Sequence, residues 1–135
     1  MRTAEDATLA KYHEHLRMTH LETPIVIGGD FNAELGSQEL IRLAQTDAVD
    51  FHEILGSPAE DRLTYIHFDQ ADTPRPETID HLLISPQLRE RVEQAKFFVY
   101  CNKGLYWIVI ERPASLQKRS LMPSDHYPQV LSLRL

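Results

Sequence analysis

The stretch Pro24-Ile25-Val26-Ile27-Gly28-Gly29-Asp30-Phe31-Asn32 decides the fold class of this chain. Its β-branched run, Ile25–Ile27, is a short apolar segment ended by glycines, which favours a strand buried on both faces. Residues two apart in an extended chain point the same way, so Asp30 and Asn32 would enter one cavity while Phe31 packs on the opposite side. Such a carboxylate and amide could orient a water and hold a phosphoryl oxygen or a hard cation. The alternative is a strand-end turn in which both side chains cap backbone groups.

Helices and strands alternate outward from this stretch. Thr3 and Asp6 predict the start of an amphipathic helix over residues 4 to about 20, and Ser37 would cap a second helix that ends at Ala44. Pro74-Arg75-Pro76 indicates a break in regular structure. The remaining expected elements are strands at Leu63–Phe68, Thr78–Ser85 and Gln129–Leu135, a short helix at Pro86–Val92, and a hairpin of Lys96–Tyr100 with Leu105–Ile110. This order predicts an α/β class with a mixed or mostly antiparallel sheet flanked by helices.

The composition is that of an ordinary globular chain. Its 135 residues, 42% of them hydrophobic, suit one domain spanning residues 1–135. The formal net charge of −6 disfavours long-range attraction to nucleic acid. One cysteine, Cys101, excludes an intramolecular disulfide and fits a reducing, cytoplasmic location, and no secretory signal is visible at Met1. The apolar stretches are too short to span a bilayer.

Two further segments carry residues suited to chemistry. Asp80 lies in the apolar run Thr78–Ser85, where a carboxylate is costly to bury without a partner, and a histidine is the natural partner. An Asp–His pair holds the imidazole in one tautomer and favours its charged form. Ser124-Asp125-His126, between prolines, could supply that histidine and a cation ligand at the sheet edge. The alternatives are a backbone-capping role for Asp80, with His81 facing solvent, and a plain surface loop at the tripeptide.

Three other histidines invite a metal interpretation. His13, His15 and His20 lie on the predicted first helix, but they lack the pair four apart that zinc hydrolases use. We therefore expect a solvated helix face.

The three segments, taken in order, resemble a known family. Asp30-Phe31-Asn32 after two glycines, Ile79–Ser85, and Ser124–Pro128 are similar to the ordered signature of the endonuclease/exonuclease/phosphatase superfamily, the deoxyribonuclease I-like fold. The resemblance implies a two-sheet α/β sandwich, of which this chain covers the C-terminal half. It also implies metal-dependent hydrolysis of phosphodiesters or phosphomonoesters. Nucleic acids, nucleotides, lipid head groups and inositol phosphates are all open as substrates.

The resemblance assigns roles to individual residues. Asp30 would orient or deprotonate the attacking water, and Asn32 would position Asp30 and a phosphate oxygen. Asp80 would pair with His126, whose charged imidazole would stabilise the developing negative charge. Asp30, Asn32 and Asp125 would hold Mg²⁺, with Mn²⁺ as a substitute.

The resemblance also implies what this sequence does not contain. The family's earlier half supplies an asparagine, a glutamate and a further histidine, and Glu34 follows Asn32 too closely to be that glutamate. We therefore expect association, either with a second copy or with a polypeptide carrying the first half. A non-catalytic binding or assembly module with the same fold is the alternative function.

Overall fold

A computed structural model describes residues 2–97, 99–100, 107–108, 125–127 and 129–134. Its helices are α1 (Arg2–Thr19), α2 (Ile41–Ala44) and α3 (Phe51–Leu55), with 3-10 turns at Ala59–Asp61 and Pro86–Arg91. Its strands are β1 (Val26–Asp30), β2 (Val49–Asp50), β3 (Tyr65–Phe68), β4 (Pro74–Glu77), β5 (Asp80–Ile84), β6 (Val92–Phe97), β7 (Val99–Tyr100), β8 (Trp107–Ile108) and β9 (Gln129–Leu133). The mixture of helices and small antiparallel sheets confirms the predicted α/β class.

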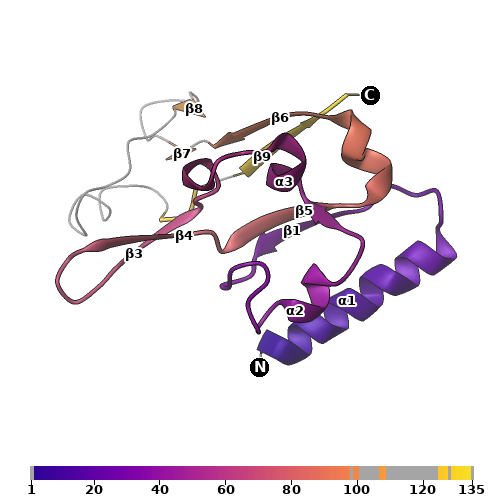
Figure 1. The fold of residues 1–135 in the computed structure, drawn as a ribbon, viewed down its shortest axis with the longest axis horizontal. Helices are drawn as coiled ribbons and strands as arrows, with labels where there is room; N and C mark the ends of the chain where they lie inside the picture. Colours follow the sequence, from indigo (N-terminus) through magenta and orange to yellow (C-terminus); the bar gives the residue numbers. More distant parts are fainter. Residues whose placement is uncertain (1, 98, 101–106, 109–124, 128, 135) are drawn as a thin grey trace.

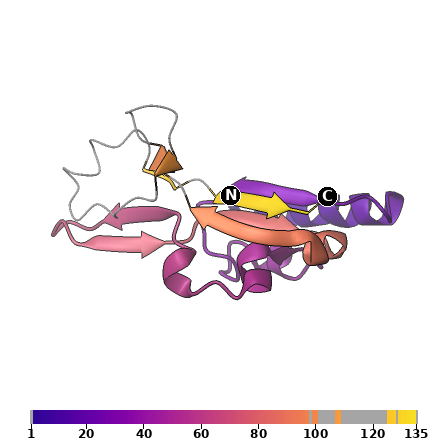
Figure 2. The ribbon, with the colours of Figure 1, turned by 90° about the horizontal axis from the view of Figure 1, so that it is seen from above.

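The β5 strand is the centre of the arrangement. It pairs with β1 on one side and β2 on the other, both antiparallel, while β3–β4, β6–β9 and β7–β8 form separate pairs. Figure 1 shows α1 and α2 along one side of β1 and β5, with β6 and β9 beyond the other. The β3–β4 hairpin projects from the β1–β5 sheet in both views (Figures 1 and 2). The β1–β5 register places Asp30 opposite Asp80.

The prediction that the first strand is buried on both faces is wrong. In β1 only Ile27 is partly buried, and Val26 is 49% exposed. The reason is position: within the described residues β1 has β5 as its single neighbouring strand, so it forms the edge of the sheet. A Cβ at Gly28 would lie 2.5 Å from Cδ2 of Leu82, so a larger residue there would require that leucine side chain to shift.

The second helix is shorter than predicted and has a different cap. It begins at Ile41, not near Ser37, and a carboxylate from α1 caps it instead. The Asp6 side chain accepts hydrogen bonds from the backbone N–H groups of Arg42 (3.0 Å) and Leu43 (2.8 Å). A residue 36 positions away thus satisfies two donors at the helix start, which local sequence could not reveal.

The proline-rich break is a strand. Pro74, Arg75 and Pro76 belong to β4, which pairs with β3 in the register Ile66↔Pro76 and Phe68↔Pro74. Proline is tolerated because β4 is the outer strand of a two-stranded hairpin and its prolines are exposed.

The C-terminal predictions are confirmed in part where the chain is described. Lys96 and Phe97, predicted as the start of the hairpin, belong instead to β6 and pair with β9. A 3-10 segment replaces the short helix after Ser85, and β9 pairs with β6. The hairpin is present as the pairs Val99↔Ile108 and Tyr100↔Trp107. Its predicted turn, Asn102-Lys103-Gly104, lies outside the described residues, as does Cys101.

Two apolar clusters adjoin Asp30 and His126. One contains Leu43, Ala48 and Leu83, with Phe31 packed against it. The second contains Ile66, Phe68 and Tyr127 and lies under the segment before β9. Within the described residues, no helix has the length and hydropathy required to cross a membrane.

The expectation of a fully solvated histidine face on α1 is wrong for one residue. His15 and His20 are exposed, but His13 is only 3% exposed and its Nε2 lies 3.5 Å from a carboxylate oxygen of Asp47. The helix turns His13 toward the loop after α2, and this contact gives no indication of a metal site.

Candidate active site

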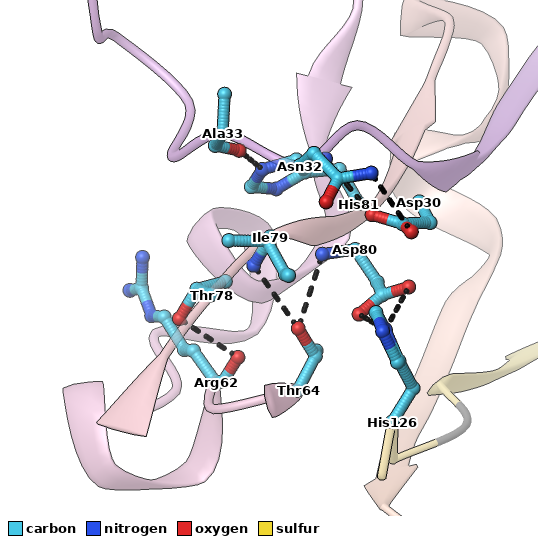
Figure 3. A network of polar contacts seen from close by, with 10 residues as sticks. All are labelled: Asp30, Asn32, Ala33, Arg62, Thr64, Thr78, Ile79, Asp80, His81 and His126. Carbon is cyan, nitrogen blue, oxygen red and sulfur yellow. Dashed lines mark hydrogen bonds and ion pairs between the residues drawn. The ribbon is translucent and has the colours of Figure 1, made fainter. Parts of the chain in front are cut away.

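Asp30 and Asn32 form a compact polar unit at the end of β1. The backbone N–H of Asn32 donates to Oδ1 of Asp30 (2.8 Å), and its Nδ2 donates to Oδ2 (3.1 Å) (Figure 3). Asn32 has φ 51°, in the left-handed region, which asparagine tolerates better than most residues. Phe31 packs into the apolar cluster, as the alternation predicted. Both Asp30 oxygens are therefore oriented by one neighbour, while the carboxylate stays exposed.

Asp80 and His126 are paired in the structure. The Nδ1 atom of His126 lies 2.9 Å from Oδ2 and 3.2 Å from Oδ1 of Asp80. Both side chains are partly exposed, at 31% for His126 and 20% for Asp80. The imidazole also packs on Tyr65, with 4.9 Å between ring centroids. A carboxylate accepts only, so Nδ1 carries the proton, and contact with a substrate would be through Nε2.

Thr64 connects the backbone at Asp80 with the backbone next to His126. Its buried hydroxyl accepts from the backbone N–H groups of Ile79 (3.1 Å) and Asp80 (3.0 Å). Its carbonyl accepts from the N–H of Tyr127 (2.6 Å), the residue after His126. One residue thus fixes the backbone on both sides of the Asp–His contact, and Figure 3 shows its side-chain contacts with Ile79 and Asp80.

Sequence reasoning gave Thr64 no such role, although a signal existed. It is a polar residue in the predicted strand Leu63–Phe68, and a buried hydroxyl requires partners. Its two donors lie 15 and 16 positions away, so only the fold identifies them.

Three of the predicted residues meet in one cluster. Asp30, Asp80 and His126 each offer one ligand atom, and these atoms lie within 4.8 Å of one another. Two carboxylates in so small a space repel each other unless a cation or a proton compensates. Oxygen-rich ligands of this kind fit a hard divalent ion such as Mg²⁺ or Mn²⁺.

The cluster differs from the expected metal set. Asn32 contacts Asp30 directly and adjoins the cluster. Asp125 is partly buried and next to His126, but it is not among the three clustered residues that the described part of the chain brings together. Its assignment as a metal ligand stays a prediction.

His81 is buried, not solvent-facing as one alternative had it. It is 2% exposed, and its Nε2 lies 2.9 Å from the carbonyl oxygen of Ala33. The signal was available in the sequence, because period-two alternation puts His81 on the same face as the buried Leu83.

The structure is a small α/β frame in which two carboxylates, Asp30 and Asp80, lie at the ends of neighbouring strands and one of them, Asp80, pairs with His126. The model of the endonuclease/exonuclease/phosphatase family matches residues 3–126, so the chain belongs to that family. The family comprises hydrolytic enzymes of the nuclease and phosphoesterase type, which generally use a divalent metal. Comparison with curated proteins gives no match.

Proposed function

We propose that this chain carries the reacting residues of a divalent-metal-dependent phosphoesterase, which cleaves a phosphodiester or phosphomonoester by in-line attack of water. The observation that supports this most is the convergence of Asp30 with the Asp80–His126 pair within 4.8 Å. Two carboxylates and one imidazole can activate water and stabilise charge on phosphorus in the same site.

Each side chain has one task in this proposal. Asp30, oriented by Asn32, accepts a proton from the attacking water as its oxygen bonds to phosphorus. His126, as a charged imidazole whose Nδ1–H is held by Asp80, donates a hydrogen bond from Nε2 to a phosphoryl oxygen that gains negative charge. The bond from phosphorus to the leaving oxygen breaks, and that oxygen takes up a proton from solvent water.

The ion would be held by Asp30 and Asp80, with Asn32 beside them and Asp125 as a further proposed ligand. Bound Mg²⁺ or Mn²⁺ neutralises charge on the phosphoryl group. Because Nδ1 of His126 is directed at Asp80, the histidine serves the substrate better than the ion. The single cysteine supports a cytoplasmic location as part of the same proposal.

Within the part of the chain that the structure describes, no strand pairs with the outer edge of β1, and this edge supports an association. Ser85 N–H donates to the Ile25 carbonyl and Phe31 N–H to the Ile79 carbonyl, both at 2.9 Å. The odd-numbered residues of this segment therefore face β5, and the backbone groups of Val26, Gly28 and Asp30 face the outer edge. Such an edge is a template for another strand, from a second copy or from a polypeptide that completes the sandwich.

The same edge favours a second candidate function. A binding or assembly module would bind its partner at the β1 edge, and its carboxylates would not hydrolyse a substrate. The two functions are separable, because only the phosphoesterase needs both a metal and a hydrolysed substrate.

Hydrolysis of p-nitrophenyl phosphate and bis(p-nitrophenyl) phosphate with Mg²⁺ or Mn²⁺ tests the proposal. We expect metal-dependent turnover by the chain alone at less than about 1 per second, which is the lower end of the kcat range typical of enzymes. Asp30→Ala and His126→Ala should abolish it, whereas Glu90→Gln, an exposed acid on another element, should leave it unchanged. Metal binding with no turnover of either ester would favour the binding module.

A further inference from the structure

A buried imidazole on β5 holds the loop that carries Asp30 and Asn32. The Nε2 atom of His81 lies 2.9 Å from the carbonyl oxygen of Ala33. Because a carbonyl oxygen only accepts, Nε2 must carry the proton and donate it. The ring also contacts Phe31, with 5.6 Å between ring centroids. His81 therefore reaches the residues on both sides of Asn32: Phe31 through the ring contact, and Ala33 through the hydrogen bond drawn in Figure 3.

Two anchors tie this loop to β5 and to Ile79, the residue before it, and Asn32 lies between them. The first is the Phe31 N–H, which donates to the Ile79 carbonyl at 2.9 Å. The second is the Ala33 carbonyl, which accepts from His81. With both ends fixed, Asn32 is held at φ 51°, a conformation that surrounding contacts must maintain in a residue other than glycine.

The other side of the imidazole is less tightly bound. Its Nδ1 lies 3.5 Å from Oδ2 of Asp50, an ion-pair distance, and Nδ1 has no hydrogen-bond partner within the described residues. Asp50 is itself fixed, because its Oδ1 accepts from the N–H of His52 at 2.8 Å. The close directional contact of His81 is thus the one made by Nε2.

We propose that His81 is a positioning residue of the candidate site. By holding the Ala33 carbonyl it maintains the left-handed Asn32, whose N–H and Nδ2 groups orient the two Asp30 oxygens. His81 contacts neither the substrate nor the ion in this arrangement. Its effect on turnover rests on the proposed function, whereas its effect on the Asn32 conformation does not.

Two amide variants separate the two ring nitrogens. The Nε2 of glutamine can occupy the place of the imidazole Nε2 and donate to Ala33, whereas the shorter asparagine reaches only the Nδ1 position. We therefore expect His81→Asn to speed hydrogen exchange of the Asn32 amide by about 10-fold, the effect of one lost hydrogen bond, and His81→Gln to change it little. The Ser85 amide, which donates within the β1–β5 pair, reports any general loosening.

Kinetics provides the second measurement. His81→Asn should lower kcat of metal-dependent ester hydrolysis with little change in KM, and His81→Gln should restore it, because the substrate contacts remain while the base is misdirected. If the wild-type chain shows no turnover, the proposed function fails, but the exchange rates still decide the role of His81.

Three results would overturn the inference. The first is an unchanged Asn32 exchange rate in a folded His81→Asn chain. The second is a His81→Gln chain that exchanges as fast as the asparagine variant while Ser85 stays protected. The third needs no variant: ¹⁵N NMR of the wild-type imidazole should show a protonated Nε2, and an unprotonated Nε2 excludes the contact even if the variants do not fold.

Discussion

The Nδ1 atom of His126 lies 2.9 Å from Oδ2 of Asp80, although the two residues are 46 positions apart. Asp80 begins β5, whereas His126 precedes β9, a strand of a separate pair. Tyr65, in β3, forms an isolated β-bridge with His126 and also packs its ring against the imidazole. Strand β3 therefore supports the contact. The pair therefore depends on three segments meeting at one end of β5.

Replacing the carboxylate by an amide tests this relationship. In Asp80→Asn the amide can donate to Nδ1, which moves the ring proton to Nε2 in the neutral form and removes the charge that stabilises an imidazolium. We expect kcat of ester hydrolysis to fall about 10²- to 10⁴-fold with the fold intact. Glu90→Gln removes the same charge from an exposed position and should have no effect. Equal rates for Asp80→Asn and wild type would remove Asp80 from the mechanism.

Thr64→Val should destabilise the chain and the site together. Valine has nearly the same shape but leaves the backbone N–H groups of Ile79 and Asp80 without their acceptor. Buried donors of this kind cost about 2 to 4 kcal/mol for the two, which urea unfolding would measure. Thr64→Ser keeps the hydroxyl and should lose much less. A valine variant as stable as the serine variant would show that the hydroxyl is not needed.

A divalent ion should stabilise the folded chain. At ten times the dissociation constant, Mg²⁺ or Mn²⁺ adds about 1.4 kcal/mol, which raises Tm by about 3 to 6 °C for a chain of this size. Asp30→Asn should remove the shift and Glu90→Gln should keep it. Calorimetry with no heat from either ion, together with an unchanged Tm, would argue against a cation site at the cluster.

Sequence patterns predicted where the strands lie better than they predicted how buried a strand is or which residue caps a helix. The strand through Asp30 and the strand from Asp80 are present, but an apolar run cannot show whether a strand is central or at an edge, and β1 is at the edge. The cap of α2 comes from Asp6, a contact between distant residues that local rules cannot assign.

The candidate site was also predictable only in part. The resemblance supplied Asp30, Asp80 and His126, which the structure brings within 4.8 Å. It gave no role to Thr64 or His81, because both side chains bind backbone groups, which have the same chemistry at every position of the sequence.

Two buried histidines should make the stability of the fold depend on pH. Burial lowers the pKa of His13 and of His52 below the ordinary 6.5, and in each case a neighbouring carboxylate opposes the shift only in part. Below pH 6.5 the unfolded chain therefore binds more protons than the folded chain. The free energy of unfolding should fall as the pH decreases from 6.5 through the lowered folded-state pKa values.

Urea unfolding across this pH range measures the effect. The slope should be at most about 1.4 kcal/mol per pH unit for each histidine. His13→Gln should flatten the curve, whereas His15→Gln, an exposed residue of the same helix, should leave it parallel to wild type. Parallel curves for both variants would mean that His13 titrates alike in the folded and unfolded chains.

The open edge of β1 should make the chain associate at micromolar concentration. The outward backbone groups of Val26, Gly28 and Asp30 can pair with a strand of a second copy or of a completing polypeptide. Val26→Lys places a charge on this edge strand and should shift sedimentation toward the monomer, because charged edges resist strand pairing. Met18→Lys adds the same charge at an exposed apolar residue of α1 and should not shift sedimentation.

A wild-type chain that sediments as a monomer at these concentrations would contradict self-association. If mixing with a polypeptide that carries the family's first half then gave neither a complex nor faster metal-dependent turnover, the β1 edge would have no role as an interface.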